Sequence, residues 1–394
     1  MTTELSRETK KHDEVLSRPI VFYFVLTSLC VFGRESFLSQ LGISEKMYNI
    51  IRYGLTLFLI ILALPHVNRK PFVYMVLLEL FFGLSYLFSS LQGYFVSDSV
   101  LVYCITTLVI CIPCSACIAS IKDRESLYNK IVSSSCIFSA IMFVYMYWPL
   151  NLGEYSMSGS YMLVYTGAVH INEFFRRKEK KWVFFVLSFA EFSTIFIKGA
   201  RGPLFCLLVY ILVKVILEMR HKPKMLFLTL IGIILLFVLW LNLSSVISFL
   251  SNVLDKAGLH SRTLGYILSK RILDDSGRGG IKDAAMEFIL KRPIIGYGAA
   301  SDTGLIGGYP HSLPIELMFD FGIIAGSLIF IYITVCVIRT LFEKESVNKD
   351  LKLIFLTQGY VMLFLSGSYL QSVFFFLFMG MMVKTTENQF VDFR

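Results

Sequence analysis

Charged residues are scarce in this sequence, and long apolar runs are abundant. Only 16% of the 394 residues are charged, whereas 56% are hydrophobic and Phe alone occurs 36 times. A soluble domain carries about 25% charged and about 45–50% apolar residues, and a disordered chain needs low hydrophobicity. The composition therefore excludes both classes and indicates an integral membrane protein.

The sequence also lacks a signal peptide and an external disulfide framework. Residues 1–18 are polar, so no cleavable apolar segment is predicted in front of the first membrane span. All eight cysteines lie in predicted spans. Cys111, Cys114 and Cys117 have the spacing of a metal motif, but on one helix they share a face and cannot surround a metal. We interpret them as small residues at a helix interface, and no metal site is predicted.

Twelve apolar runs have the character of membrane-spanning helices. A bilayer core needs about 20 apolar residues per helix, and a spanning segment must satisfy its backbone groups internally. We therefore predict an all-α polytopic membrane protein with about 12 transmembrane helices. The runs lie near residues 19–33, 47–65, 72–91, 98–121, 127–149, 155–173, 181–198, 202–219, 225–249, 311–338, 351–367 and 369–384.

The basic residues set the predicted topology. The net charge is +9, and most of the 37 Lys and Arg fall on one side of the membrane if the N-terminus is cytoplasmic. This is the positive-inside pattern, and it places both termini in the cytoplasm. The charges are scattered over short loops without a nucleic-acid motif, so nucleic-acid binding is excluded. The predicted regions are a cytoplasmic tail (1–18), a nine-helix membrane region (19–249), an external loop (250–310), a three-helix membrane region (311–384) and a cytoplasmic tail (385–394).

The external loop at residues 250–310 is far longer than any other loop. Long loops in compact proteins are usually functional or disordered. Ile281 to Leu290 has apolar residues at helical spacing opposite charged ones, and Asn252 to Leu268 does so less cleanly. We predict short amphipathic helices at the outer membrane surface, which serve either catalysis or as a structural cap. Five glycines between Gly296 and Gly308 predict a mobile flap over a ligand, with Tyr297 as a candidate substrate contact.

Several external cations run against the positive-inside bias. Arg201 and Lys198 lie in the short turn between the seventh and eighth predicted spans, and Arg278 stands between glycines ahead of the amphipathic stretch. An arginine presents a rigid fork of donors that fits phosphate oxygens. The alternative for Arg201 is an interfacial anchor that reaches lipid phosphate. Arg262 is a further candidate substrate-binding cation in the long loop.

Other ionisable residues are candidates for proton transfer or substrate binding. His311 lies at the mouth of the tenth predicted span, where a near-neutral pKa suits proton transfer from a hydroxyl. Glu316 and Asp320 follow within that span, where ionisable groups are costly and are functional candidates. Glu191 lies two helical turns before Lys198. We expect it to pair with one of the two cations of the following turn, or to serve as a base.

The order of these motifs along the chain is informative. The short external turn reads ARGP, and the long loop reads SGR, then RPIIGYG, then YPHSLPIELMFDFGIIAG as it enters the next span. This order resembles the O-antigen polymerase and O-antigen ligase superfamily of bacterial surface-polysaccharide assembly. Ser312 stands where that family usually has Asn. The matching positions are Arg201, Arg278, Gly296, Gly298, His311, Glu316, Gly322 and Gly326.

The resemblance implies a glycosyltransferase C-like membrane enzyme without a metal or other cofactor. Such an enzyme uses sugar chains linked to undecaprenyl diphosphate at the external face of the bacterial cytoplasmic membrane. A flippase and a chain-length regulator of the same pathway are implied partners. By this resemblance, Arg201 and Arg278 clamp the diphosphate, and His311 accepts a proton from the acceptor sugar hydroxyl or orients it. The expected substrate-binding residues are Lys198, Arg262, Tyr297, Glu316 and Glu191.

Three functions remain open at this point. A polymerase adds the growing chain to another lipid-linked repeat unit, and the YPHSLPIE phrase favours it. A ligase moves the chain to the lipid A core of lipopolysaccharide. A transporter of lipid-linked saccharide is expected to have repeated halves and broken spans with midplane charges, and the sequence has no internal repeat.

Overall fold

The computed structural model is helical throughout the residues that it describes, and no strand occurs among them. The described residues are 2–35, 45–94, 98–147, 157–198, 201–219 and 278–383, with a few single positions between 248 and 256.

The chain divides into two compact units. Unit 1 comprises Met1–Thr27, Ser44–Ile131 and Asp275–Arg394. Unit 2 comprises Ser28–Ile43 and Val132–Asp274. Two helices, α1 (Thr2–Glu35) and α6 (Arg124–Tyr147), begin in unit 1 and end in unit 2.

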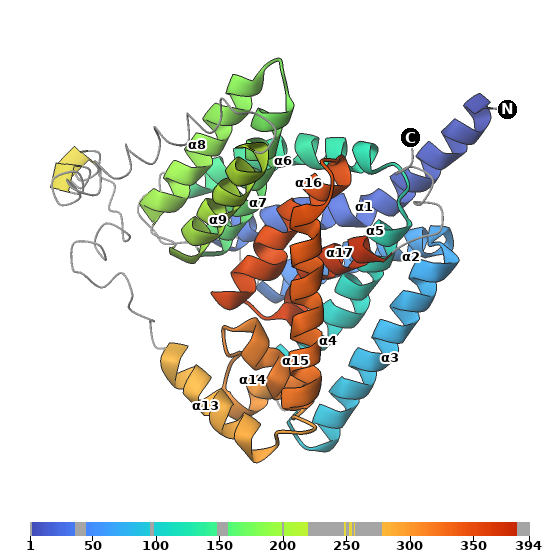
Figure 1. Cartoon of the computed structure of the whole chain (residues 1–394), viewed down its shortest axis with the longest axis vertical. Coiled ribbons are helices and arrows are strands. Elements are labelled where there is room, and N and C mark those ends of the chain that lie inside the picture. Colours follow the sequence, from blue (N-terminus) through green and yellow to red (C-terminus); the bar gives the residue numbers. More distant parts are fainter. Residues whose placement is uncertain are drawn as a thin grey trace. The chain divides into compact units, whose positions relative to one another are not determined.

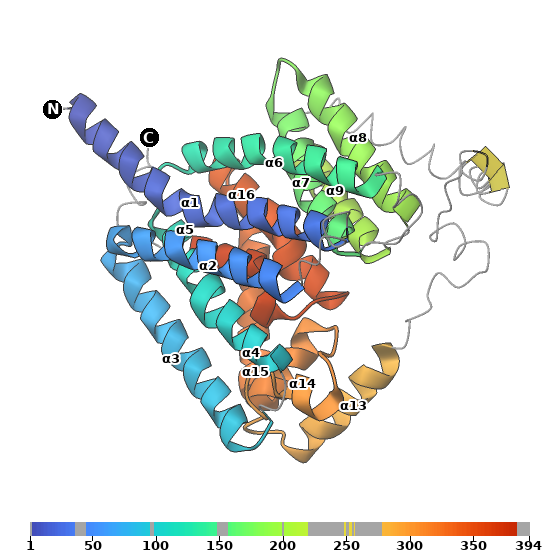
Figure 2. The ribbon, with the colours of Figure 1, turned by 180° about the vertical axis from the view of Figure 1, so that it is seen from behind.

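Unit 2 contains a bundle of three helices. These are α7 (Met157–Arg176), α8 (Lys181–Lys198) and α9 (Arg201–Met219). Each of the three contacts the other two, and the green ribbons in Figure 2 show them side by side. Their short connections agree with the antiparallel packing that short loops produce.

Unit 1 holds the remaining helices, coloured blue, cyan and orange to red in Figure 1. Helices α3 and α17 both pack against α5, so segments from the two ends of the sequence meet there. The first group is α2 (Glu45–Ala63), η2 (Leu64–His66), α3 (Arg69–Leu91), α4 (Asp98–Ile105), η3 (Thr106–Cys111) and α5 (Ile112–Ser120). The second group is α13 (Arg278–Lys291), α14 (Ser301–Ile306), α15 (Leu313–Phe342), α16 (Val347–Leu356), η4 (Thr357–Val361), η5 (Met362–Phe364), η6 (Tyr369–Gln371) and α17 (Val373–Met382).

Most predicted apolar runs agree with these helices where the structure describes them, and the exceptions are the last two runs. The run at 98–121 is one continuous helical stretch formed by α4, η3 and α5. The ninth run, at 225–249, lies outside the described residues, apart from two single positions. In the described part, six helices are long and apolar enough to cross a membrane. The protein is therefore a helical membrane protein, and the count of twelve spans stays a prediction.

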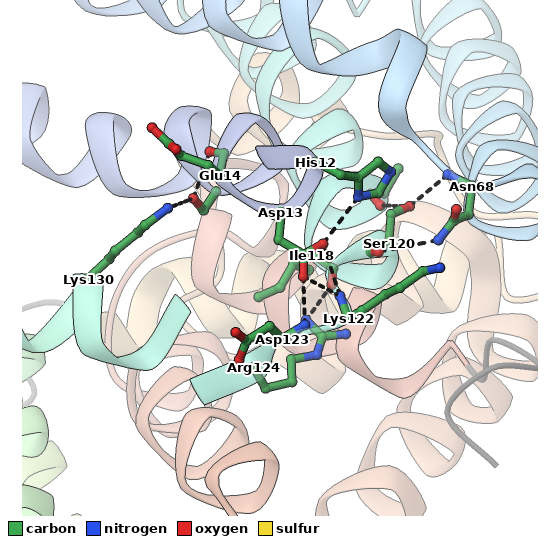
Figure 3. A network of polar contacts seen from close by, with 12 residues as sticks. His12, Asp13, Glu14, Asn68, Ile118, Ser120, Lys122, Asp123, Arg124 and Lys130 are labelled. Atoms are coloured by element: carbon green, nitrogen blue, oxygen red, sulfur yellow. Dashed lines mark hydrogen bonds and ion pairs between the residues drawn. The ribbon is translucent and has the colours of Figure 1, made fainter. Parts of the chain in front are cut away.

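Segments that the charge pattern places on one side of the membrane lie together in unit 1. Figure 3 shows the polar network that joins them. A carboxylate oxygen of Asp13 in α1 accepts the backbone N–H of Asp123 at 2.7 Å. The side-chain amide of Asn68, just before α3, donates to the carbonyl of Ser120 at 3.2 Å. These bonds tie the N-terminal helix to the ends of α5 and α3.

Segments predicted to be external also lie together. The guanidinium of Arg292 donates to the side-chain oxygen of Gln92, which follows α3. The backbone of Gly304 in α14 lies so close to Tyr94 that an added Cβ would be 2.4 Å from the Tyr94 carbonyl oxygen. Gln92 and Tyr94, which follow α3, thus form part of the surface on which the long loop packs.

Helix α15 is broken at Gly322, where φ is 79° and ψ is 167°. The glycine segment of the long loop fills the break. The backbone N–H groups of Tyr297 and Gly298 donate to the carbonyls of Phe319 and Asp320 at 3.0 and 2.9 Å. A Cβ at Gly322 would lie 2.2 Å from the Ile294 carbonyl oxygen. The glycines therefore allow two backbones to touch, and the first part of the predicted flap, residues 293–298, is docked on α15.

The last two predicted spans are not two full helices. The run from α16 through η5 ends at Phe364, and a turn leads to η6 and the ten-residue helix α17. The carbonyl of Leu370 in η6, directly after this turn, accepts a hydrogen bond from the hydroxyl of Thr107, in the middle of the 98–120 stretch, at 2.6 Å. Non-helical backbone at such a position is tolerated in a membrane protein when it is buried in protein. Leu370 is fully buried.

Candidate active site

Arg278 is the first residue of α13, whereas the sequence pattern had placed it just ahead of the amphipathic stretch. Its guanidinium donates to the backbone carbonyl of Leu365, in the turn after η5. This bond brings the start of the long-loop helix against the turn that leads to η6. A guanidinium has five N–H donors, so one bond to a carbonyl leaves a cation with donor capacity beside this turn.

His311 lies two residues before the first residue of α15 and has an unusual backbone. Its φ is 54°, in the left-handed region, and its ring lies 4.2 Å from the ring of Tyr309. Within the described part of the chain, its Nδ1 is buried and has no hydrogen-bond partner. A strained residue with an unpaired polar atom is a feature that clusters at functional sites.

The electrostatic surroundings keep His311 neutral. Burial, together with the cations of Arg278 and Lys282, lowers the pKa of His311 to about 4. The expectation of a near-neutral pKa is therefore corrected. Arg278, Lys282 and His311 act on one another in unit 1, so the structure brings together two of the three predicted catalytic residues.

Three buried carboxyl groups lie on α14 and the first turns of α15. Asp302 and Asp320 are 1% exposed, and Glu316 is fully buried. The predicted substrate-binding residue Glu316 is held in place by the turn before η6, because it accepts bonds from the hydroxyl of Ser368 and the backbone N–H of Tyr369. The hydroxyl of Tyr369 donates to Oδ2 of Asp320 at 2.7 Å.

We define Asp302, Glu316 and Asp320 as the acid cluster. The hydrogen-bond donors that contact these carboxyl groups are fewer than the carboxylate oxygens that can accept. Oδ1 of Asp302 accepts the N–H of Thr303 at 2.7 Å. Among the described residues, Oδ2 of Asp302 and Oδ1 of Asp320 are buried without a partner. Burial raises the pKa of Asp302 to about 7, because a charged carboxylate is costly away from water.

Asp302 was missed by the sequence reasoning. It is the only Asp, Glu, Lys or Arg between residues 293 and 315. That isolation in a stretch of small and apolar residues is the signal that could have marked it. Its burial depends on α14 packing against α4 and α15, which no local pattern predicts.

Tyr297, a predicted substrate contact, belongs to the apolar core of the long loop. It is buried with Ala285, Ile289 and Phe319. Its hydroxyl donates to the carbonyl of Phe288 at 3.0 Å. These contacts favour a packing role for Tyr297.

Glu191 has a different partner from the cations that were expected. Its two carboxylate oxygens lie 3.0 and 3.1 Å from Nδ1 of His170 in α7, and both residues are fully buried. The hydroxyl of Ser139 in α6 also donates to Glu191. Glu191 thus has a partner that was not predicted, and its predicted pairing with Lys198 or Arg201 stays a prediction, because the side chain of Lys198 lies outside the described residues.

The other predicted residues are placed only in part. Arg201 is the first residue of α9 in unit 2, and Lys198 is the last residue of α8. Arg262 lies outside the described residues, as does nearly all of the second amphipathic stretch. Among the residues that the structure describes, no group of three or more His, Cys, Asp or Glu side chains could hold a metal ion.

A family model described as O-antigen ligase matches residues 183–330. No curated protein and no solved structure matches the chain. The matched range holds all three predicted catalytic residues and the acid cluster. It indicates activity of the O-antigen polymerase or ligase type, and so a glycosyltransferase-like membrane enzyme. The match confirms the resemblance drawn from the motifs, and the chain carries a domain of the O-antigen polymerase and ligase superfamily.

Proposed function

We propose that this protein polymerises oligosaccharide repeat units linked to undecaprenyl diphosphate into a surface polysaccharide, such as O-antigen or capsule. The growing chain is transferred from its lipid diphosphate to a hydroxyl of the acceptor repeat unit. The observation that carries the proposal is the effect of Arg278 and Lys282 of α13 on His311, which lies just before α15, inside the range matched by the family model.

In this proposal the cations bind the diphosphate of the donor lipid. As the bond between the sugar and the diphosphate breaks, negative charge grows on the leaving oxygen. Donors that are already in place stabilise such charge without reorganisation, and they act most strongly away from bulk water. The guanidinium of Arg278 is positioned by the Leu365 carbonyl before substrate arrives. Lys282 lies one helical turn further along α13 and adds a second positive charge.

His311 binds the acceptor in its neutral form. With a pKa near 4, the imidazole at neutral pH has one N–H donor and one acceptor nitrogen. It therefore orients the acceptor hydroxyl by hydrogen bonding. Its left-handed backbone fixes the ring beside Tyr309.

Arg201 is proposed as a second diphosphate ligand, on the ARGP motif and its place at the start of α9. Two cations that act on one leaving group give effects that are not additive. Replacing both Arg201 and Arg278 with Ala should therefore reduce chain formation by less than the product of the two single effects. Full additivity would assign Arg201 to another step, such as anchoring at lipid phosphate.

A second candidate function, transport of the lipid-linked saccharide, is favoured by one observation. Transporters often have discontinuous membrane helices with polar groups near the break. Helix α15 is broken at Gly322 and carries Glu316 and Asp320 before the break. The polymerase proposal uses the same break to seat the glycine segment. The two candidates differ in their product, because a transporter moves repeat units without joining them.

The deciding experiment replaces Arg278 with Ala in cells that depend on this protein for their surface polysaccharide. We expect the long-chain ladder on a gel to collapse to single repeat units that still reach the cell surface. Long chains stranded on undecaprenyl diphosphate would identify a ligase instead. Repeat units that never reach the outer side would identify a transporter.

The matched control is Arg292→Ala at equal protein level. Arg292 is also an arginine at an end of α13, but its guanidinium is used by Gln92 and lies 5.0 Å from the ring centre of Tyr297. Its loss should leave the ladder intact. An unchanged ladder with Arg278→Ala, with normal amounts of protein, would contradict the proposed function.

A further inference from the structure

The acid cluster has no role in the function proposed so far. Asp302 stands out within it, because it lies in the long loop, whereas Glu316 and Asp320 lie on α15. One of its carboxylate oxygens is held by the backbone of Thr303, and the other is buried without a hydrogen-bond partner among the described residues. A buried, unpaired carboxylate oxygen costs free energy, so its retention calls for an explanation.

The groups that face Asp302 come from two other elements. Glu316 and Asp320 of α15 and Tyr103 of α4 are the titratable groups on which the charge of Asp302 acts. All are acids, so none of them supplies a positive charge that would stabilise the ionised form of Asp302, and burial raises its pKa. Arg278 and Lys282 act instead on His311. The site is therefore divided into a cationic side and an acidic side.

We propose that Asp302 accepts the proton of the acceptor sugar hydroxyl during chain transfer. This inference rests on the proposed function. The hydroxyl oxygen attacks the anomeric carbon of the donor, and its O–H proton passes to Oδ2 of Asp302. The bond from the anomeric carbon to the diphosphate oxygen breaks, and the electron pair stays on the diphosphate, beside Arg278. The cationic side thus takes the developing negative charge, and the acidic side takes the proton.

The proton affinities of the two candidate bases support this division. A general base is most effective when its pKa lies near the operating pH. Burial raises the pKa of Asp302 to about 7. The pKa of His311 is lowered to about 4 by burial and by the cations beside it. His311 is therefore a weak base, and it is suited to orienting the hydroxyl.

The acceptor must reach an oxygen that is covered in this structure. Asp302 lies on the six-residue helix α14, between two left-handed backbone positions, Ala300 with φ 59° and Gly307 with φ 74°. Such positions can absorb a change of backbone direction, as hinge residues do. The acceptor therefore reaches Asp302 when α14 shifts as a unit.

The test uses the full-length protein in liposomes with a donor and acceptor linked to undecaprenyl diphosphate. The maximal rate of chain formation is measured from pH 5 to 9 for the wild type, Asp302→Asn and Asp302→Glu. We expect the wild-type rate to rise with pH as Asp302 loses its proton. Asp302→Asn should lose about 10²–10⁴-fold and lose this rise, with the KM for the lipid donor unchanged. Asp302→Glu should keep a pH-dependent rise with a shifted midpoint.

Two controls separate a catalytic role from a structural one. Asp283→Asn removes an exposed carboxylate of α13 and should match the wild type. Formate should partly restore Asp302→Ala, because a small carboxylate can replace the missing base. An Asp302→Asn protein with the wild-type rate and pH profile overturns the inference. So does an Asp302→Ala protein that is folded, binds the lipid donor and is not rescued by formate.

Failure of the inference is distinguishable from failure of the proposed function. If the wild type forms chains and Arg278→Ala does not, the proposed function stands whatever the result at Asp302. If the wild type forms no chains at any pH, the proposed function fails, and the role of Asp302 fails with it.

Discussion

Both units bury carboxylates, but these carboxylates differ in whether their oxygens have hydrogen-bond partners. In unit 2, Glu191 has His170 and Ser139 as partners, and each contributes a hydrogen bond. In unit 1, Asp302 and Asp320 each keep one buried oxygen without a partner in the described part of the chain. We call Glu191 and His170 the matched pair. In the acid cluster of unit 1, by contrast, there are more carboxylate oxygens than donors.

The difference indicates which carboxylates hold the fold and which remain available for chemistry. A buried polar network whose members are all satisfied makes its region rigid, whereas a partly satisfied one is costly. Such a cost is retained at sites where a substrate or a proton completes the network. We therefore assign Glu191 to the helix packing of unit 2, and we assign the acid cluster to the site in unit 1.

The largest effect is expected from breaking the matched pair. Glu191→Ala leaves His170 buried without its carboxylate, and breaking such a pair costs about 3–5 kcal/mol. The variant should be poorly expressed and should unfold at lower temperature in detergent. The fraction that folds should keep its rate of chain formation.

A double variant sharpens this prediction. Replacing both His170 and Glu191 with Leu removes both charges at once, and such replacements are often neutral or stabilising. The double variant should therefore recover much of the stability lost by Glu191→Ala. If it is no more stable than the single variant and also loses activity per folded molecule, Glu191 has a role in catalysis and the comparison fails.

The next effect concerns the pH dependence of stability in unit 1. The pKa of Asp302 is raised from 3.8 to about 7 on folding, so the folded protein binds this proton more tightly than the unfolded chain. Its contribution to stability is complete below about pH 4 and is lost as the pH rises through 7. A pKa change of that size corresponds to about 4 kcal/mol.

The measurement is the difference in unfolding temperature between the wild type and Asp302→Asn. The variant should gain stability relative to the wild type as the pH rises from 4 to 8. Asp283→Asn, which removes an exposed carboxylate, should show no such trend. A flat difference at Asp302 would mean that this carboxyl is not buried in the folded protein.

The sequence predicted where helices occur better than it predicted where they begin, break and end. Hydrophobic runs mark a helical segment whatever it packs against, so each described run contains a helix, although the last two runs are not full spans. The break at Gly322 was not predicted, because the flanking residues are apolar on both sides and the cause lies in a distant segment, residues 293–298. The short α17 was not predicted for the same reason: an apolar run gives a maximum length, and packing decides where the helix starts.

The site was predicted where a residue type carries its own meaning. An arginine on the wrong side of a membrane and a histidine at the mouth of a span are unusual by themselves, and Arg278 does lie close enough to His311 to lower its pKa. The pairing of Glu191 with His170 was not predicted, since the two residues lie 21 positions apart on different helices. The burial of Asp302 and the low pKa of His311 depend on tertiary packing, which composition and spacing do not contain.

A smaller effect is expected where the loop meets the broken helix. Gly322→Ala forces a non-glycine residue into a backbone conformation that costs about 1–3 kcal/mol, and it pushes a Cβ against the Ile294 carbonyl. The packing of the glycine segment, residues 293–298, against the break in α15 should weaken, and this should expose the acid cluster. Proteolysis within residues 293–300 and hydrogen exchange at Gly298 should both increase.

The control is Gly280→Ala in α13, where nothing lies within 4 Å of the added Cβ. Alanine is favoured over glycine within a helix by about 0.5–1 kcal/mol. That variant should be as stable as the wild type or slightly more stable. Equal proteolysis of the two variants would mean that the docked segment does not depend on Gly322.

The smallest effect is expected from His311 on the pH profile of catalysis. Because the pKa of His311 is lowered to about 4, this residue does not change charge between pH 5.5 and 8. His311→Asn should lower the rate at every pH in that range by the same factor and leave the midpoints unmoved. A profile that loses its rise near neutral pH in His311→Asn would make His311 the base and would leave Asp302 with a structural role.

The stability contributed by His311 provides an independent check with the opposite sign to that of Asp302. Its folded pKa lies below the unfolded value of 6.5, so the folded protein binds this proton less tightly than the unfolded chain. Its contribution is complete above about pH 6.5 and is lost as the pH falls toward 4. The wild type should therefore lose stability relative to His311→Asn on acidification, whereas it loses stability relative to Asp302→Asn as the pH rises. Opposite trends at the two residues would show that burial and the nearby cations disfavour a proton on His311, while burial favours one on Asp302.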